Sequence, residues 1–416
     1  MSNVRYERDS ARTIRELEFP CATVLDTAAL RRRWAPWFDL SPAPDTPRRA
    51  QHAAQLASML DGDAEPAVPH WFSIISPAGT REQIIRQARL DDYLVTAPDA
   101  MPELLRTGRW RSLADAVRRW AELDPARRVV VIELLTQLGF HPAVARLVPQ
   151  VTMTPEDELG QQLAYEVARS CRQLDRHSTV PLQVFGWLAE EAVRPSLRVS
   201  AALQVASALT RAQRAPEQAS DWLKRCAAAS TELRHEPAWL EHLVRSRVHR
   251  AAALVAVRLG KPANGADEMR AALAEDDLLA DVDADPQASY QLENRALVLE
   301  AFLKLDTATS LGAAPADVVT QARQVDPYDV DLHFAVGRYL VAQDAADQGV
   351  QAFLTAAGSG TVRGAVAAFE AGLALDRLGR PGEAAAAYRL CLDLDPASTS
   401  ARERLTAGPV AAGRTS

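Results

Sequence analysis

Three aspartates with alternate spacing, Asp281, Asp283 and Asp285, match the opening of a calcium-binding loop. Such a loop needs a glycine at its sixth position and a glutamate at its twelfth. Here Pro286 and Leu292 occupy those positions. The pattern therefore favours an acidic loop between two helices over a calcium site.

Two histidines, His242 and His249, fall on one face of a predicted helix. Seven residues of helix correspond to a rise of about 10.5 Å, which is too far for joint binding of one zinc ion. A third, His235, lies before Pro237 and is expected outside that helix. The pattern indicates ordinary histidines on the surface or in a groove, and the sequence predicts no metal site.

Other ligand motifs are incomplete. Gly358, Gly360 and Gly364 have the wrong last spacing for a dinucleotide loop and follow a predicted helix. Gly260-Lys261 is followed by proline and is not a phosphate loop. The sequence also has no nucleophile elbow and no pair of zinc-binding histidines of the protease type. It predicts no cofactor and favours a non-enzymatic role, although scattered catalytic residues remain an alternative.

An arginine run, Arg31 to Arg33, stands beside Trp34, Trp37 and Phe38. The same residue types bind nucleic acids or membrane surfaces. However, the chain has a formal net charge of −7, so nucleic acid is not the predicted partner and a packed aromatic cluster is favoured. No signal-like or membrane-spanning segment and no paired-cysteine motif is evident, which leads us to expect a cytoplasmic protein.

A repeat near the C-terminus predicts the helices that carry most of these candidate residues. Residues 365–396 contain two apolar-periodic segments separated by Gly379-Arg380-Pro381-Gly382. A shift of 35 residues superimposes small and large positions of one helical hairpin on another. The matched pairs are Gly372 with Gly337, Leu375 with Leu340, Ala384 with Gly349, Tyr388 with Phe353, and Cys391 with Ala356.

This hairpin resembles the tetratricopeptide repeat (TPR). Weaker copies cover residues 246–277 and 297–327. The resemblance implies an all-α fold, a right-handed superhelix of antiparallel helix pairs, which we expect over residues 101–405. Sparse aromatic residues, 6% of the chain, agree with an all-α body. Residues 1–100 are expected to form a less regular N-terminal module, mixed α/β, or a cap, and residues 406–416 a flexible tail.

The TPR resemblance also implies a concave groove lined by the first helix of each pair. Lys304 and Arg338 share one template position and Arg250 lies close to it, which suggests a cationic ladder for an acidic partner. The asparagines that clamp a C-terminal carboxylate in chaperone-binding members have no counterpart, so that ligand is not expected. The groove positions carried over are Arg247, Arg250, Leu254, Leu297, Glu300, Lys304, Asp331, Phe334, Arg338, Phe369 and Leu373.

These observations predict a scaffold or adaptor that binds a protein or peptide in the groove. Two alternatives stay open. A peptide-sensing transcriptional regulator would need a DNA-binding helix within residues 1–100, where Pro44, Pro47 and the β-like run Trp71–Ile75 interrupt a three-helix pattern. An enzyme, or an accessory subunit of a biosynthetic pathway, would need a pocket in or near the same module.

Overall fold

The computed structural model describes residues 108–137, 140–150, 152–175, 178–211, 215–235, 238–281, 289–325, 329–358 and 362–407. Four features discussed from the sequence lie wholly or partly outside these residues. They are the predicted N-terminal module, the loop after Asp281, the Gly358–Gly364 spacing and most of the predicted tail. Thr406, assigned to the tail, ends a helix instead.

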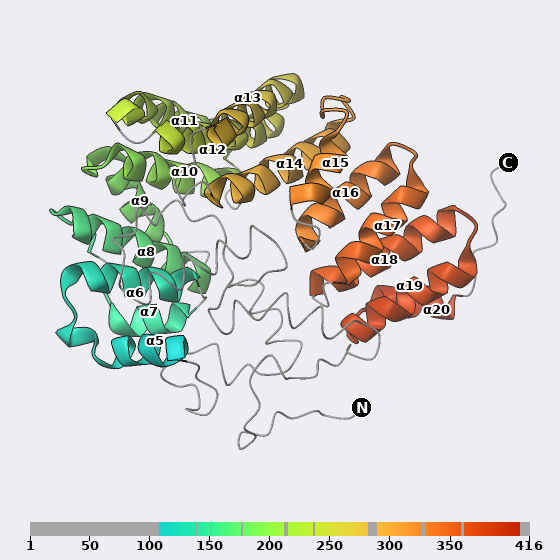
Figure 1. Cartoon of the computed structure of the whole chain (residues 1–416), viewed down its shortest axis with the longest axis horizontal. Helices are drawn as coiled ribbons and strands as arrows, with labels where there is room; N and C mark the ends of the chain where they lie inside the picture. The colour runs from blue at the N-terminus through green and yellow to red at the C-terminus, as the bar shows by residue number, and fades with distance from the viewer. Residues whose placement is uncertain are drawn as a thin grey trace, which may run out of the picture. The chain divides into compact units, whose positions relative to one another are not determined.

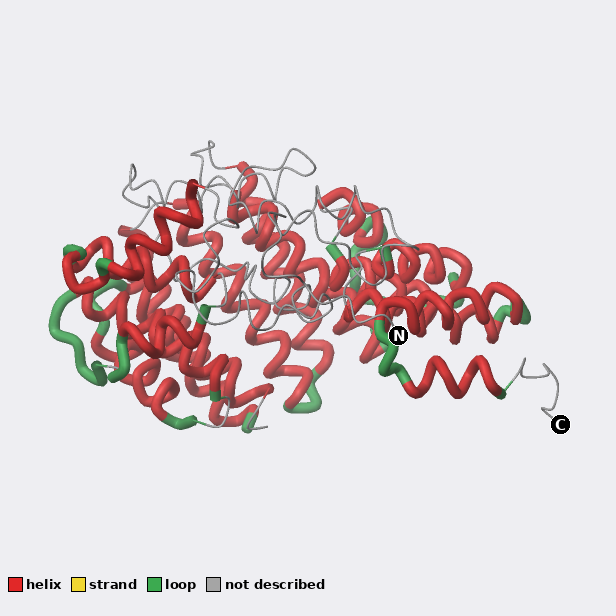
Figure 2. The backbone as a smooth tube through the Cα atoms, turned by 90° about the horizontal axis from the view of Figure 1, so that it is seen from below, coloured by secondary structure: helices red, strands yellow, loops and turns green. Residues whose placement is uncertain are grey.

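The described residues form sixteen α-helices and contain no strand, which confirms the all-α prediction for this part of the chain (Figures 1 and 2). Short 3-10 helices cover Trp120–Glu122 and Thr231–His235. The α-helices are α5 (Gly108–Arg118), α6 (Pro125–Gln137), α7 (His141–Leu147), α8 (Glu158–Leu174), α9 (Val180–Glu191), α10 (Pro195–Arg211), α11 (Pro216–Ser230), α12 (Ala238–Arg258), α13 (Pro262–Asp281), α14 (Ser289–Thr309), α15 (Val318–Val325), α16 (Val330–Ala342), α17 (Ala346–Ala357), α18 (Val362–Arg377), α19 (Pro381–Leu394) and α20 (Thr399–Thr406).

Local chemistry explains where many helices begin. Proline is the first residue of α6, α10, α11, α13 and α19, a position that suits its fixed φ and its missing N–H. Asp157 caps α8 by accepting a 2.7 Å hydrogen bond from the Gly160 amide, and Asp329 caps α16 through the Leu332 amide at 2.9 Å.

The turns within three helix pairs share one backbone geometry. Gly260, Asp344 and Gly379 end α12, α16 and α18 with φ of 72°, 59° and 70°. The residue after each donates its amide back across the turn, as in Ala345 N to Leu340 O at 2.9 Å and Arg380 N to Leu375 O at 3.0 Å. This is the left-handed termination that glycine favours. It supports the 35-residue shift, which places Asp344 on Gly379.

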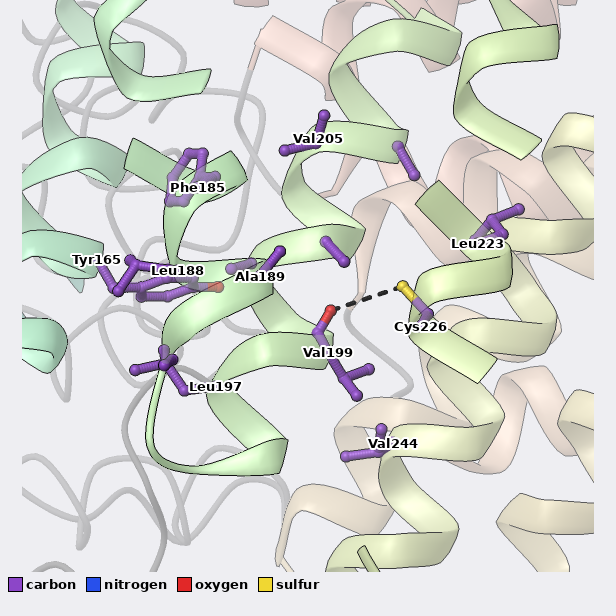
Figure 3. Close-up of a cluster of buried hydrophobic side chains, with 14 of the residues drawn as sticks. Tyr165, Phe185, Leu188, Ala189, Leu197, Val199, Val205, Leu223, Cys226 and Val244 are labelled. Carbon is purple, nitrogen blue, oxygen red and sulfur yellow. Dashed lines mark hydrogen bonds between the residues drawn. The ribbon is translucent and has the colours of Figure 1, made fainter. Parts of the chain in front are cut away.

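Contacts divide the described residues into two compact units, residues 108–298 and 299–407, with the division inside α14. The core of the first unit is an apolar cluster on α8 to α13 (Figure 3). In it the rings of Tyr165 and Phe185 meet edge to face at 5.3 Å, and the Cys226 thiol donates to the Val199 carbonyl at 3.8 Å. Buried apolar side chains stabilise this stack of helices.

The second unit contains the two repeat copies, α16–α17 and α18–α19. The glycines matched by sequence lie under aromatic rings: a Cβ on Gly337 would lie 2.5 Å from Cδ1 of Phe353, and a Cβ on Gly372 would lie 2.7 Å from Cδ1 of Tyr388. Real Cβ atoms do not approach other atoms so closely. In each repeat copy, the glycine at the small position therefore contacts the aromatic ring at the large position.

We expect Gly372→Leu to lower the free energy of unfolding by about 1–3 kcal/mol, because the added side chain must displace the Tyr388 ring. That ring is held by the phenol hydroxyl, which donates to Asp376 Oδ2 at 2.6 Å. Urea unfolding followed by circular dichroism measures the change. Gly382→Ala in α19 is the control, since its Cβ would meet nothing within 4 Å. Equal stability of Gly372→Leu and the parent would contradict the contact.

Candidate functional site

Polar side chains gather on one side of α8 and continue onto α10. Tyr165, Arg169 and Arg172 are spaced four and three residues apart, so they share a helix face. Gln204 of α10 donates through Nε2 to the Tyr165 hydroxyl at 3.4 Å. Arg172 donates from Nη1 to the Gln204 side-chain oxygen at 3.1 Å and to its carbonyl at 3.3 Å. These bonds connect α8 to α10 through polar groups.

A buried ion pair lies within this side of α8. Arg169 donates from Nη1 to both carboxylate oxygens of Glu166, each at 2.9 Å. The Glu166 side chain is only 2% exposed and that of Arg169 is 18% exposed. Glu133 of α6 is fully buried, and its charge helps to raise the pKa of Arg169. Charges removed from water this far are costly unless paired.

Arg247 of α12 belongs to the same polar region. Burial raises the pKa of the Tyr165 phenol, and the positive charges of Arg169 and Arg247 act in the opposite direction, so both guanidinium groups lie near that hydroxyl. Arg247 itself is buried, while Arg250 and Leu254, one and two turns further along α12, are half-buried. We call Tyr165, Arg169, Arg172, Gln204 and Arg247 the arginine face.

The remaining predicted groove positions belong to the second unit, with the exception of Leu297. Leu297 is half-buried in α14, at the end of the first unit. Lys304 forms an ion pair with Glu300 one turn away in the same helix. Burial raises the pKa of the Glu300 carboxyl, Lys304 lowers it, and Asp329 and Asp331 raise it further. Asp331 therefore lies near the Glu300–Lys304 pair.

Aromatic rings dominate the rest of these positions. Phe334 is buried with its ring 5.6 Å from that of Phe353, and Phe369, half-buried, lies 5.6 Å from the Tyr388 ring. Arg338 is exposed and Leu373 half-buried. Phe369 also lines an open hollow of about 370 Å³ together with Ser400, Glu403, Arg404 and Ala407. Thus the predicted groove position Phe369 borders a cavity in the described part of the chain.

The histidines of α12 each contact a different carboxylate of α13. His242 Nδ1 lies 2.8 Å from Glu275 and His249 Nδ1 lies 2.7 Å from Glu268. Within the described residues no cluster of histidine, cysteine and carboxylate groups is suited to a metal ion. These histidines join the two helices of a pair.

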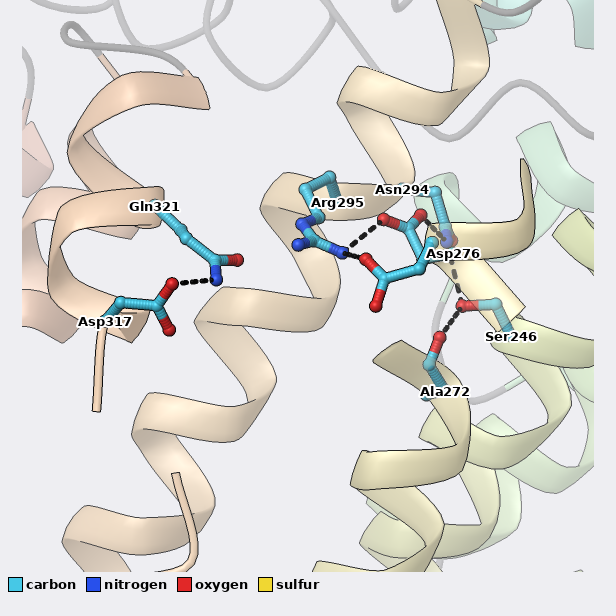
Figure 4. A network of polar contacts seen from close by, with 8 residues as sticks. Ser246, Ala272, Asp276, Asn294, Arg295, Asp317 and Gln321 are labelled. Atoms are coloured by element: carbon cyan, nitrogen blue, oxygen red, sulfur yellow. Dashed lines mark hydrogen bonds and ion pairs between the residues drawn. The ribbon is translucent and has the colours of Figure 1, made fainter. Parts of the chain in front are cut away.

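A second buried polar network joins α12, α13 and the start of α14 (Figure 4). Asn294 donates from Nδ2 to Ser246 Oγ at 2.8 Å and to Asp276 Oδ1 at 2.7 Å, and Arg295 donates to Asp276 Oδ2 at 3.2 Å. Asp276, Asn294 and Ser246 are fully buried. Burial raises the pKa of the Asp276 carboxyl to about 6, although Asn294 and Arg295 act to lower it.

The sequence predicted Arg247 and Arg250 but missed Tyr165, Arg169, Arg172 and Gln204. Their helical spacing was visible in residues 157–174, but the repeat template does not reach that segment. From the sequence, Asn294 was considered only as a possible carboxylate clamp. Its place in a buried network could not be predicted, because its partners lie on two other helices.

No protein-family model matches the chain, and a search of curated proteins finds no match to it. None of the helices in the described part of the chain is long and apolar enough to cross a bilayer.

Asp276→Asn should change how stability depends on pH. The folded-state pKa of Asp276, about 6, lies above the ordinary value of 3.8, so folding favours its protonated form. The stability of the parent relative to Asp276→Asn should therefore fall, by about 2 kcal/mol, as pH rises from 4.5 to 7. Urea unfolding at several pH values measures it. Asp267→Asn, which changes an exposed carboxyl of α13 paired with Arg270, is the control, and a pH-independent difference between parent and Asp276→Asn would contradict the shift.

Arg169→Met should destabilise the chain by about 3–5 kcal/mol, because it leaves the Glu166 carboxylate buried without its partner. The double variant Arg169→Met/Glu166→Gln should recover part of the loss, since no buried charge remains. Thermal and urea unfolding compare them. Lys224→Met breaks an exposed pair with Asp221 and should cost less than about 1 kcal/mol. A similar small loss in Arg169→Met would mean that water reaches the Glu166–Arg169 pair.

Proposed function

We propose that the chain is a protein- or peptide-binding scaffold whose helix pairs present a continuous surface to a partner. The observation that carries this proposal is the arginine face, in which polar side chains of α8, α10 and α12 lie together within one unit. Stacked helix pairs bind extended segments in this way because each pair adds a strip to the same surface. The TPR resemblance of the sequence supports the same role.

The chemistry of the described residues also favours binding. Arginine, glutamine and tyrosine are the polar groups of the arginine face, and none of them is a nucleophile held by a base. Ser170 Oγ of α8 lies 3.0 Å from His141 Nδ1, but this serine is only 1% exposed and also contacts Thr136. Guanidinium groups and amides recognise peptide carboxylates and carbonyls through directed hydrogen bonds. The regulator and enzyme alternatives both depend on residues 1–100, which lie outside the described part of the chain.

Selection from a displayed library of random 12-residue peptides on the purified full-length chain tests the proposal. We expect related sequences to be enriched and to bind the chain in solution, as measured by fluorescence anisotropy with synthetic copies. Failure to enrich any family of sequences, together with no binding by the pooled peptides, would count against a peptide-binding scaffold.

The cationic ladder expected from the sequence gives a second test. Charge reversal of Arg250, Lys304 and Arg338 together should weaken an enriched peptide at least tenfold if its binding uses the ladder. Circular dichroism checks that the fold is retained, because Arg250 is half-buried and Lys304 pairs with Glu300. Binding of the parent should weaken between 0.05 and 0.3 M salt, since screening lengths fall below about 10 Å. Lys224→Glu on α11 is the matched control. Unchanged affinity in the triple variant would exclude the ladder.

A further inference from the structure

We propose that the hollow formed by α18 and α20 binds a free aromatic α-amino acid. The ring of this ligand lies against Phe369 and Ala407. Its carboxylate meets Arg404 and its ammonium group meets Glu403. The ligand is a small molecule and not the peptide partner proposed above, so either proposal can fail without the other.

The hollow has the dimensions of a small-molecule site. Its volume is about 370 Å³, and ligand pockets in proteins start at about 300 Å³. Most of its lining comes from one face of α20, a helix that packs against α19 (Figure 1). The lining residues of α20 are spaced as neighbours on one helix face. They are Ser400, Glu403, Arg404 and Ala407, and Phe369 of α18 completes the lining.

The repeat geometry favours an aromatic ring in the ligand. In both repeat copies the small residue of the first helix lies under an aromatic ring of the second helix. A further shift of 35 residues from Gly372 places Ala407 at this small position. Ala407 is exposed and borders the hollow, and residues 408–416 contain no aromatic side chain. A ring supplied by a ligand can therefore lie on Ala407, at the place that Tyr388 takes on Gly372.

Phe369 supplies the second apolar surface of the hollow. Its ring is half-buried and lies 5.6 Å from the Tyr388 ring, at an interplanar angle of 47°. Tyr388 thus supports Phe369, which also borders the hollow. Aromatic rings attract one another in tilted and offset arrangements beyond the effect of burial. A benzyl or indole group is therefore a better fit to this lining than an aliphatic side chain.

Two charged side chains of opposite sign border the hollow. Among the residues that the structure describes, neither the Glu403 carboxylate nor the Arg404 guanidinium forms an ion pair or a side-chain hydrogen bond. A lone carboxylate is attracted by Arg404 and repelled by Glu403, and a lone amine the reverse. An α-amino acid carries both groups on one carbon. It is therefore attracted by both side chains.

The Arg404 guanidinium lies beside the aromatic pair. Burial and the hydrogen bond to Asp376 raise the pKa of the Tyr388 phenol, and the positive charge of Arg404 acts in the opposite direction. Arg404 therefore lies near the Tyr388 hydroxyl, and the Tyr388 ring contacts that of Phe369. A carboxylate bound by Arg404 leaves the ring of the same small molecule within reach of Phe369.

Calorimetric titration of the purified full-length chain with L-phenylalanine, L-tyrosine and L-tryptophan tests the inference. We expect at least one of them to bind with a dissociation constant of about 0.1–1 mM, a modest affinity because the ligand is small and the hollow is open. L-alanine, which lacks the ring, should bind at least tenfold more weakly. No binding by the three aromatic amino acids up to about 10 mM, or equal binding by alanine, would overturn the inference.

Analogues of the tightest ligand test the two charges. For phenylalanine, 3-phenylpropionate lacks the ammonium group and phenethylamine lacks the carboxylate, and each should bind at least tenfold more weakly. N-acetylphenylalanine amide keeps the ring but carries neither charge, as a residue inside a peptide does. Equal binding of either singly charged analogue would overturn the inference. Equal or tighter binding of the capped residue would also overturn it, because the hollow would then accept a peptide side chain.

Variants locate the site. Glu403→Gln and Arg404→Gln should each weaken the amino acid at least fivefold, because each removes one of the two charges. Ala407→Leu should abolish binding, because the larger side chain fills the hollow. Arg389→Gln removes a charge from an exposed position of α19 that does not border the hollow, and it should leave affinity unchanged.

Circular dichroism checks the fold of each variant, and Arg404→Gln decides the outcome if Ala407→Leu fails to fold. Unchanged affinity in Arg404→Gln, or an equal loss in Arg389→Gln, would overturn the assignment to this hollow. The library selection reports separately on the scaffold. Enriched peptides without amino-acid binding retain the scaffold and overturn this inference, whereas amino-acid binding without enriched peptides supports this inference alone.

Discussion

Close approach of two helices under an aromatic ring is the constraint on which the repeat depends. Gly337 and Gly372 leave no room for a Cβ because Phe353 and Tyr388 lie directly on them. A ring can reach the backbone of a neighbouring helix only where that helix lacks a side chain. The contact therefore fixes the rotation of each helix about its axis, and with it the side on which the remaining residues of that helix lie.

The fold could be predicted in outline because its signals are local. Apolar periodicity, prolines at helix starts and the Gly260 and Gly379 turns each act within one helix pair. The 35-residue match identified the repeated small and large positions, but not that each ring lies on the glycine of its own helix pair. The distances between pairs, and the division within α14, depend on many contacts between segments far apart in the chain, which no local pattern records.

The candidate site could be predicted only in part, for the same reason. Arg247 and Arg250 fell within a recognisable repeat copy, so a template position located them. Tyr165 and Gln204 contact each other across 39 residues, and neither lies at a conspicuous spacing from the other. Asn294 likewise meets Ser246 across 48 residues. A single sequence shows which residues are polar, whereas burial decides which of them must find partners.

The two buried polar regions differ in what they require of the chain. In the α12–α13–α14 network, Asn294 and Arg295 bond Asp276 directly, and the contacts join the three helices. Such a network can be explained by helix positioning alone. In the arginine face, the Glu166–Arg169 pair lies within α8 and neutralises a buried carboxylate, whereas Gln204 joins α8 to α10 through Tyr165 and Arg172. Breaking the Glu166–Arg169 pair would leave a buried charge, so this region must satisfy charge as well as position helices.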